Sequence, residues 1–259
     1  MKLKNKYLNE LLDFALKIVL KSEKITTKYY RKKNKHKLKK NKTPVTIADF
    51  KCEDYLLSKI KAHYKGHDIL SEERGVEDNK SDFKWIIDPI DGTRNFMRRL
   101  PFWGTLLALE WEGEVILGII SMPAIKEFIF DAKGKGCIYN GKKAKVSKID
   151  NVNDSYCLHG GLDYILKQTY SKNFLNLTRQ SLYSRGFGYC LGHSLIINGR
   201  SEIMVDPHVA PYDIASVKIC VEEAGGALTD MKGNKTIYNG NALVTNGKVH
   251  DEVLKILNG

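Results

Sequence analysis

Apolar residues recur every three or four positions through the first thirty residues, at Leu8, Leu11, Leu12, Ala15, Ile18 and Val19. This spacing predicts an amphipathic helix over about 4–30. Acidic residues interrupt the apolar positions, so the segment is typical of a helix and not of a signal peptide. A second helix is expected from Thr43-Pro44 to about Tyr64, because threonine can cap a helix and proline fits its first turn.

Shorter apolar runs rich in β-branched residues predict strands in the next part of the chain. Two of them, 103–111 and 114–122, flank a Glu112-Gly113 turn and should form a hairpin. The other strands are expected at 68–70, 84–87, 127–131 and 137–140. The last two should continue the antiparallel sheet that the hairpin begins.

From about residue 150 the pattern changes to strands that alternate with helices. The strands are expected at 156–159, 182–185, 202–205 and 242–245, and the helices at 164–170, 190–198, 211–224 and 249–257. Gly225-Gly226 should end the third of these helices as a C-cap pair. The mixture predicts an α/β (α+β) fold built in layers, with an N-terminal half over 1–150 and a C-terminal half over 151–259.

The length of 259 residues suits one large domain or two closely packed halves. No apolar run approaches the roughly 18–20 residues that span a bilayer, so we expect a cytoplasmic protein with no membrane partner. The five cysteines are scattered and form no CxxC pair. They predict reduced, buried side chains and neither a disulfide framework nor a zinc site.

The net charge of +12 is concentrated in one segment, 28–42, which holds nine Lys or Arg and no acid. The rest of the chain therefore carries only about +3. Such a run can be a solvated connection, an electrostatic funnel for an anionic substrate or a surface that binds nucleic acid. Nucleic acid is the weakest of the three, because no nucleic-acid motif accompanies the run.

Acidic residues follow two of the predicted strands. Strand 68–70 runs into Glu72, and strand 84–87 runs into Asp88 and Asp91. If the strands are neighbours, the carboxylates repel one another strongly unless a cation neutralises them. Oxygen ligands of this kind select Mg²⁺, Mn²⁺ or Ca²⁺ and not zinc. Taken alone, the aspartates could equally be turn or helix-cap residues, and Glu72 a solvated surface acid.

The turn after strand 84–87 adds a place for phosphate. Pro89 fixes the backbone, so the Ile90 carbonyl can point at the same cation. Gly92 allows close backbone approach. A helix that begins at Thr93 would offer its first amides to a phosphoryl group.

Four ordered motifs resemble those of one known family. WIIDPIDGTRNF (85–96) and PYDIASVKICVEEAGG (211–226) resemble the two signatures of the inositol monophosphatase superfamily, and TPVTIAD (43–49) and ILSEE (69–73) resemble its intermediate motifs. The resemblance covers essentially the whole chain, as one family domain over 1–259. It implies a layered αβαβα sandwich of the inositol monophosphatase or sugar phosphatase type. It also implies a Mg²⁺-dependent phosphatase that acts on a small phosphorylated metabolite, and a homodimer.

The resemblance assigns the metal ligands residue by residue. Glu72, Asp88 and the Ile90 carbonyl should hold one Mg²⁺, and Asp88, Asp91 and Asp213 a second. Glu72 should share a third, weaker ion. Mn²⁺ is the expected substitute for Mg²⁺.

The resemblance also implies the roles that complete a direct hydrolysis. Thr93 and Asp49 should orient and deprotonate the attacking water, with Glu72 as a further catalytic residue. The amides of Gly92 and Thr93 should bind the phosphate. Asp213 should face the substrate as well as the metal.

Several stretches resemble the histidinol-phosphatase branch of the family. Arg94 follows the Asp-Gly-Thr turn, and the run LPFWGTLLALEWEGEVILGIISMPA (100–124) is similar to that of the branch. Asp206 lies where the family places an acid against the substrate, and it suits hydroxyls or the amine of histidinol. Arg185 is a further candidate for substrate contact. One departure is Tyr189, which stands where the branch carries an acid.

Histidinol phosphate is therefore the first substrate expected. Inositol-1-phosphate and a 3′(2′),5′-bisphosphate nucleotide are the alternatives, and a basic nucleic-acid-binding protein is the non-enzymatic one. The seven histidines form no HxxH or HExxH pattern. Of these, His208 is interpreted as a surface residue.

Overall fold

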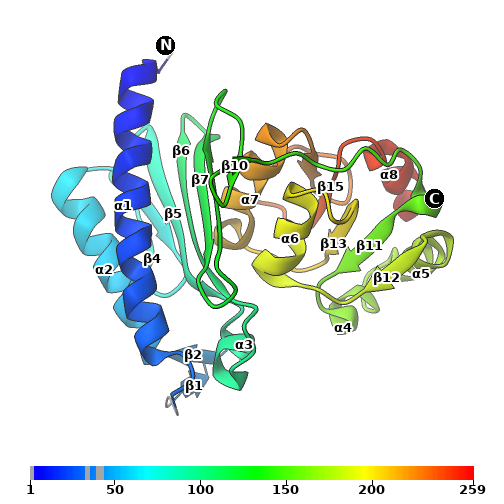
Figure 1. Ribbon diagram of the computed structural model, residues 1–259, viewed down its shortest axis with the longest axis horizontal. Helices are drawn as coiled ribbons and strands as arrows, with labels where there is room; N and C mark the ends of the chain where they lie inside the picture. Colours follow the sequence, from blue (N-terminus) through cyan, green and yellow to red (C-terminus); the bar gives the residue numbers. More distant parts are fainter. Residues whose placement is uncertain (1–2, 33–35, 39–43) are drawn as a thin grey trace.

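A computed structural model describes residues 3–32, 36–38 and 44–259 of the chain. It has five layers, in which helices and sheets alternate from one side of the molecule to the other (Figure 1). The layers confirm the predicted αβαβα sandwich. One hydrophobic cluster joins the first two layers, a second joins the third layer to the layers on both sides of it, and a third joins the fourth layer to the fifth.

Two long helices form the first layer. They are α1 (Asn5–Tyr29) and α2 (Ile47–His63). Leu11, Ala15 and Val19 on α1 are completely buried, so the predicted apolar stripe is the face that packs on α2 and the adjoining sheet. Burial of such a stripe, more than helix propensity, stabilises a helix in a protein.

The predicted start of the second helix is wrong. Pro44–Thr46 is a short strand, β2, paired with β1 (His36–Leu38). Thr46 is the N-cap of α2, since its hydroxyl accepts a hydrogen bond from the Ala48 N–H (3.1 Å). In return, Asp49 accepts one from the Thr46 N–H (2.9 Å). This reciprocal cap fixes the first turn three residues later than expected, and Thr43 lies outside the described residues.

The basic segment 28–42 is only partly described. It includes the end of α1 and the strand β1, whereas 33–35 and 39–42 lie outside the described residues. Its function therefore stays a prediction.

The second layer is an eight-stranded sheet in the order β10-β9-β8-β7-β6-β5-β3-β4. The strands are β3 (Asp68–Ser71), β4 (Gly75–Glu77), β5 (Phe83–Asp91), β6 (Gly104–Trp111), β7 (Glu114–Met122), β8 (Glu127–Ala132), β9 (Ile138–Tyr139) and β10 (Lys142–Lys143). The pair β3 and β5 is parallel, and the other pairs are antiparallel. The predicted hairpin is β6–β7. The parallel pairing places β3 and β5 side by side, and these are the two strands at whose ends the sequence analysis found acidic residues.

Two helices lie between the sheets: α6 (Tyr189–Ile197) and α7 (Pro211–Glu223). Gly118 on β7 sets how closely α7 approaches, because a Cβ there would lie 2.6 Å from the Ile219 side chain and 2.7 Å from the Ser216 carbonyl oxygen. A side chain at position 118 would push the helix away from the sheet.

The fourth layer is a five-stranded sheet in the order β12-β11-β13-β15-β14. Its strands are β11 (Tyr156–His159), β12 (Tyr183–Arg185), β13 (Ile203–Asp206), β14 (Ala227–Thr229) and β15 (Ala242–Thr245), and its outer face carries α4 (Leu162–Ile165), α5 (Ser171–Gln180) and α8 (His250–Asn258). A one-turn 3-10 helix, η1 (Val152–Asp154), precedes β11.

The single helix expected at 164–170 is wrong. Two helices, α4 and α5, lie on either side of a break at 166–170, and α5 was not expected at all. Only Phe174 and Leu177 of α5 are buried. Its sequence is too polar to suggest a helix, and contact with α8 and η1 stabilises it instead. The three-residue strand β14 was also missed.

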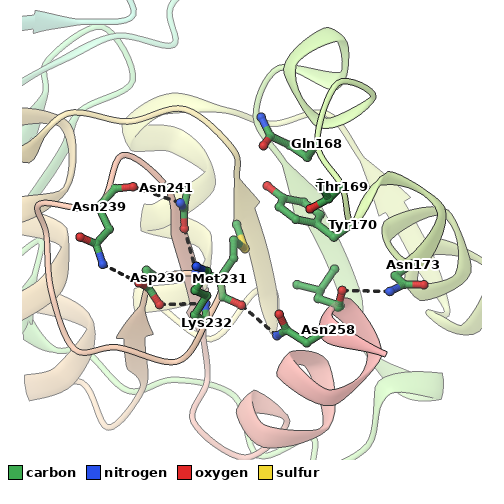
Figure 2. A pocket seen from close by; sticks show the side chains of 11 residues that line it. Gln168, Thr169, Tyr170, Asn173, Asp230, Met231, Lys232, Asn239, Asn241 and Asn258 are labelled. Carbon is green, nitrogen blue, oxygen red and sulfur yellow. Dashed lines mark hydrogen bonds between the residues drawn. The ribbon is translucent and has the colours of Figure 1, made fainter.

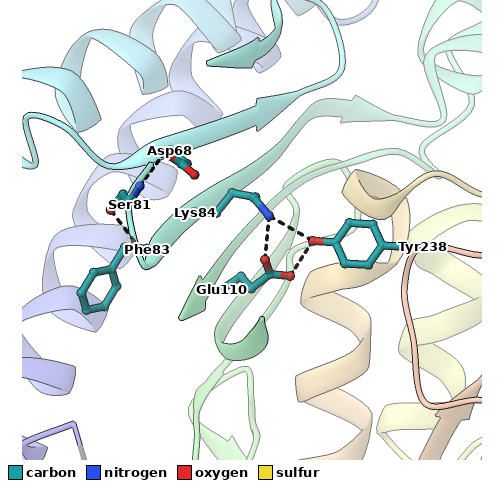
Figure 3. Close-up of polar contacts among 6 residues, drawn as sticks. All are labelled: Asp68, Ser81, Phe83, Lys84, Glu110 and Tyr238. Atoms are coloured by element: carbon teal, nitrogen blue, oxygen red, sulfur yellow. Dashed lines mark hydrogen bonds and ion pairs between the residues drawn. The ribbon is translucent and has the colours of Figure 1, made fainter. Parts of the chain in front are cut away.

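The two sheets use separate stretches of chain, and polar contacts join these stretches. Lys84 on β5 donates to Glu110 on β6 (2.8 Å), and Tyr238, from the loop before β15, donates to the other oxygen of Glu110 (2.5 Å) (Figure 3). Glu110 is only 4% exposed, so water screens this bridge weakly. Division into halves near residue 150 stays a proposal.

Among the described residues, every helix is too short or too polar to cross a membrane.

Candidate active site

Three aspartates converge where β5 ends against the first turn of α7. Oxygens of Asp88, Asp91 and Asp213 all lie within 4.8 Å of one another. Asp88 and Asp91 are three positions apart, so on a regular strand they would point to opposite faces. The pairing of β5 with β6 shifts register between them. This irregularity turns both side chains toward one point, as bulges near functional sites do.

Burial and mutual repulsion dominate the electrostatics of this cluster. Burial raises the pKa of Asp88 well above its usual range, and the charges of Glu72, Asp91 and Asp213 raise it further. The pKa of Asp213 is raised well above its usual range by burial and then by Asp91. Burial raises the pKa of Asp91 to about 6, although the Cys190 N–H donates to it. Such a site favours protons or a cation.

Glu72 joins the cluster from the neighbouring strand. Its backbone N–H donates to the Ile87 carbonyl (3.1 Å), which extends the β3–β5 pairing past the end of β3. Its half-buried side chain lies close enough to Asp88 for its charge to raise the pKa of Asp88 further. The Ile90 carbonyl accepts a hydrogen bond from the Thr93 hydroxyl (3.1 Å), so the structure places it at the site.

Asp49 and Thr93 form the pair that the sequence predicted. The Thr93 hydroxyl lies 3.3 Å from Asp49 Oδ1 and can donate to it. The other oxygen of Asp49 accepts from the hydroxyl (2.5 Å) and the N–H of Thr46. Asp49 is completely buried. Burial raises its pKa to about 6 against the effect of these hydrogen bonds, with a smaller contribution from Glu72. A carboxylate with such a pKa can accept a proton near neutral pH.

Gly92 occupies a position that other residues fill only with strain. It caps the short helix α3 (Thr93–Arg98), which confirms the predicted helix start, and its φ of 81° is left-handed. A Cβ at this position would lie 2.9 Å from the Phe102 carbonyl oxygen and 3.5 Å from Cγ of Tyr189. The backbone is therefore open on this side only because residue 92 has no side chain.

Asp206, at the end of β13, lies close to the aspartate cluster. Its charge raises the pKa of both Asp91 and Asp213. Gly160 leaves room for it, since a Cβ there would lie 2.5 Å from Asp206 Oδ1. On its other side, Nε2 of His193 lies 3.6 Å from Asp206 Oδ2.

His193 is the residue that the sequence analysis missed. It lies on α6 and is 2% exposed, and its charge lowers the pKa of Asp91. Its Nδ1 is buried and has no hydrogen-bond partner among the described residues. The isolated histidine has no motif around it, so only the packing of α6 between the sheets reveals it. His208, by contrast, is exposed as predicted and stacks on Tyr164.

The two predicted arginines differ in their surroundings. Arg94 is exposed and lies near enough to Tyr189 for its charge to lower the tyrosine pKa, which burial raises. Arg185 is exposed, and its guanidinium lies 3.8 Å from the centre of the Tyr183 ring and donates to the Ser184 carbonyl (2.8 Å). Arg94 therefore lies near Tyr189 at the opening of the site, whereas Arg185 contacts residues of its own strand.

Tyr189 itself borders the site. It has a left-handed φ of 63°, which is unusual for a residue with a bulky side chain. Burial raises its pKa, as do the charges of Asp91 and Asp206. The strained backbone at the start of α6 therefore holds an aromatic ring beside Gly92.

A separate polar cavity of about 610 Å³ lies in the C-terminal half (Figure 2). Its lining includes Tyr170, Asp230, Asn239, Asn241 and Asn258, none of them predicted as a site residue. Asp230 is held by hydrogen bonds from Asn234 and Asn239. Asp230 is therefore satisfied within the wall, whereas the buried Tyr170 hydroxyl has no hydrogen-bond partner among the described residues.

Comparison with known proteins agrees with this geometry. The model of the inositol monophosphatase family matches residues 7–258. The chain is 35% identical to the histidinol-phosphatase of Chlorobaculum parvum, over 90% of this chain and 91% of the relative. It is 32% identical to the fructose-1,6-bisphosphatase/inositol-1-monophosphatase of Thermotoga maritima, over 95% of each chain. The solved structure of a Thermotoga maritima IMPase superposes with a TM-score of 0.87 at 30% identity, covering 96% of this chain and 97% of the other.

These matches extend over nearly the whole chain, and they favour the enzyme over a nucleic-acid-binding protein. The chain belongs to the inositol monophosphatase family and is a phosphatase of phosphomonoesters.

Proposed function

We propose that the protein is a Mg²⁺-dependent phosphatase of histidinol phosphate. The observation that supports metal dependence is the convergence of Asp88, Asp91 and Asp213 within 4.8 Å. These residues fit Mg²⁺, because all offer hard oxygen ligands and burial leaves their charges uncompensated. Glu72 and the Ile90 carbonyl would complete the set, with two or three ions in all. Once bound, Mg²⁺ would acidify a water molecule and neutralise charge on the phosphoryl oxygens.

The residues around the cluster supply the remaining steps. Thr93 would orient the attacking water, since its hydroxyl already lies between the Ile90 carbonyl and Asp49. Asp49 would accept the proton, for which a pKa of about 6 is suitable. The Gly92 and Thr93 amides would hold the phosphoryl group at the start of α3. Attack by water would give the alcohol and inorganic phosphate without a covalent enzyme intermediate.

Phosphate release tests the chemistry. With Mg²⁺, the wild-type protein should release phosphate in a malachite-green assay, and EDTA should abolish the release. Asp88→Asn and Asp213→Asn should lose the activity, whereas Asp230→Asn, which changes a buried acid elsewhere, should keep it. Full activity in either of the first two variants would overturn the proposal.

Asp206 supports the choice of histidinol phosphate. It is 8% exposed and lies near the metal-binding acids, where it can pair with the amine of the substrate. Tyr189 offers an aromatic ring to the imidazole, and Arg94 lies close by. The relative from Chlorobaculum parvum carries the name of this activity.

A substrate panel tests this choice. It consists of histidinol phosphate, inositol-1-phosphate, fructose-1,6-bisphosphate and 3′-phosphoadenosine-5′-phosphate. Histidinol phosphate should have the largest kcat/KM. Asp206→Ala should lower kcat/KM for the cationic substrate more than for inositol-1-phosphate, whereas equal losses would exclude a charge interaction.

Inositol-1-phosphate is the second candidate. The similarity to the Thermotoga maritima fructose-1,6-bisphosphatase/inositol-1-monophosphatase favours it, and the Asp206 carboxylate can also accept hydrogen bonds from polyol hydroxyls. A larger kcat/KM for inositol-1-phosphate would select this function.

We also propose a homodimer, as the family resemblance implies. Strand β12 forms one edge of the five-stranded sheet, and Leu182, just before it, and Tyr183 on it are 63% and 39% exposed. Such exposed apolar side chains at a sheet edge favour association. Light scattering should give the mass of a dimer for the wild type and of a monomer for Leu182→Glu. A monomeric wild type would refute the proposal.

A further inference from the structure

A second cluster of metal-ligand types lies away from the active site. Asp131 on β8, Cys137 just before β9 and Cys220 on α7 each offer an atom within 4.8 Å of the other two. Cys137 and Cys220 are completely buried and Asp131 is 1% exposed. All five cysteines are free and buried, but these two come together from positions 83 residues apart only through the fold.

The Asp131 carboxylate has no hydrogen-bond partner for either oxygen among the described residues. The Gly118 N–H lies near enough to act to lower its pKa, but without the geometry of a hydrogen bond. Burial, followed by the charges of Glu223 and Glu222, outweighs that effect and raises the pKa well above the usual range. Two buried carboxylate oxygens without hydrogen bonds lower the stability of the folded protein, and a purely structural role for Asp131 does not explain why they are there. An apolar side chain would fill the same space without this cost.

The surrounding contacts hold the three ligands in place. Glu223, one turn beyond Cys220 on α7, accepts hydrogen bonds from the N–H groups of Gly134 (2.6 Å) and Gly136 (2.8 Å). The turn that leads from Asp131 to Cys137 is therefore attached to the same helix as Cys220. On its other side, the Cys220 thiol lies 3.9 Å from the Gly118 carbonyl oxygen.

We propose that Asp131, Cys137 and Cys220 form a structural site for Zn²⁺. Thiolates select zinc and other thiophilic ions over Mg²⁺, and zinc also accepts carboxylate oxygen, so these residues would supply three of the four ligands of a tetrahedral site. Neighbouring ligand atoms of tetrahedral zinc are roughly 3.5–3.8 Å apart, given Zn–S of about 2.3 Å and Zn–O of about 2.0–2.2 Å. A small contraction of the observed cluster would therefore suffice. Binding would displace the thiol protons and satisfy the orphan carboxylate.

This site would link the third layer to the eight-stranded sheet. Cys220 lies seven residues after Asp213 on α7, about two helical turns away. A zinc ion that ties α7 to β8 would thus fix the helix that carries Asp213 into the active site. The zinc would be structural and distinct from the Mg²⁺ of the proposed function.

Cobalt binding to the metal-free, full-length protein tests this inference. Co²⁺ should produce thiolate-to-cobalt charge-transfer absorption in the near ultraviolet at one ion per chain. Zn²⁺ should displace it, and Mg²⁺ should not. Cys137→Ala and Cys220→Ala should lose this absorption, whereas the matched control Cys157→Ala, which removes a buried thiol from another core cluster, should retain it.

The same samples separate this site from the catalytic one. Asp88→Asn should lose phosphatase activity but keep the thiolate–cobalt absorption. Zn²⁺ should raise the Tm of the wild type and of Cys157→Ala but not that of Cys220→Ala. No thiolate absorption in the wild type at saturating Co²⁺ would overturn the inference without reference to any variant. An undiminished signal in Cys220→Ala would also overturn it.

Discussion

Replacing Asp91 by asparagine should stabilise the metal-free protein, which is opposite to the usual effect of changing a buried polar residue. Burial raises the pKa of Asp91 from its usual 3.8 to about 6. Each pKa unit corresponds to 1.36 kcal/mol, so the ionised carboxylate destabilises the native state by up to about 3 kcal/mol. Asparagine has no charge, and its carbonyl can still accept the hydrogen bond from the Cys190 N–H.

The sign of the pH dependence follows from proton binding. Between pH 3.8 and about 6 the native state holds the Asp91 proton more tightly than the unfolded state, so the contribution of this residue to stability falls as pH rises. Below pH 3.8 both states are protonated and wild type and Asp91→Asn should be equally stable. Above about pH 7 the full difference should be present.

Thermal unfolding in EDTA at pH 4 and pH 8 measures this difference. About 3 kcal/mol corresponds to a Tm higher by about 6–12 °C for the variant at pH 8, at 2–4 °C per kcal/mol. Mg²⁺ should reverse the order, because it stabilises only a protein that binds it and the variant lacks one ligand.

Asp230→Asn is the matched control. Burial acts to raise the pKa of Asp230, but hydrogen bonds from Asn234, Asn239 and the Lys232 N–H outweigh it and lower the pKa. Asp230→Asn should therefore destabilise the protein at pH 8, with or without Mg²⁺. If Asp91→Asn lowers the Tm in EDTA as Asp230→Asn does, the aspartate cluster is not under electrostatic strain and the argument for a cation fails.

Three further predictions follow from single contacts. Gly92→Ala should lower the free energy of unfolding, measured in urea, by about 1–3 kcal/mol and should lower phosphatase activity, because φ is left-handed and a Cβ would lie 2.9 Å from the Phe102 carbonyl oxygen. Unchanged stability and activity would show that position 92 tolerates a side chain. Thr93→Ala should lower kcat by about 10²–10⁴-fold with little change in KM or Tm; an effect on KM alone would make Thr93 a binding residue only. Gly118→Ala should destabilise the protein by about 1–3 kcal/mol, since the new methyl group meets Ile219 and Ser216 of α7; normal stability would show that α7 can shift freely.

Most of the layered fold and the identity of the acids could be predicted from the amino-acid sequence. Strongly periodic segments such as 4–30 and the 103–122 hairpin need no tertiary context, because their apolar pattern already specifies a face to bury. The acids at the ends of strands 68–70 and 84–87 predicted a cation site, and the motifs around them indicated the family. Local signals failed where tertiary contacts decide the outcome, as in α5, whose polar sequence is helical only against α8 and η1.

The assembly of the site, in contrast, depends on how the elements pack in three dimensions. The register shift between Asp88 and Asp91 brings together side chains that a regular strand would separate. His193 reaches Asp206 only because α6 packs between the two sheets. Asp131, Cys137 and Cys220 meet in the same way, through contacts between β8, the β8–β9 turn and α7. A sequence pattern or motif describes residues that are close along the chain. These sites depend instead on distances between segments that are far apart in the sequence, and only the packing of the elements sets those distances.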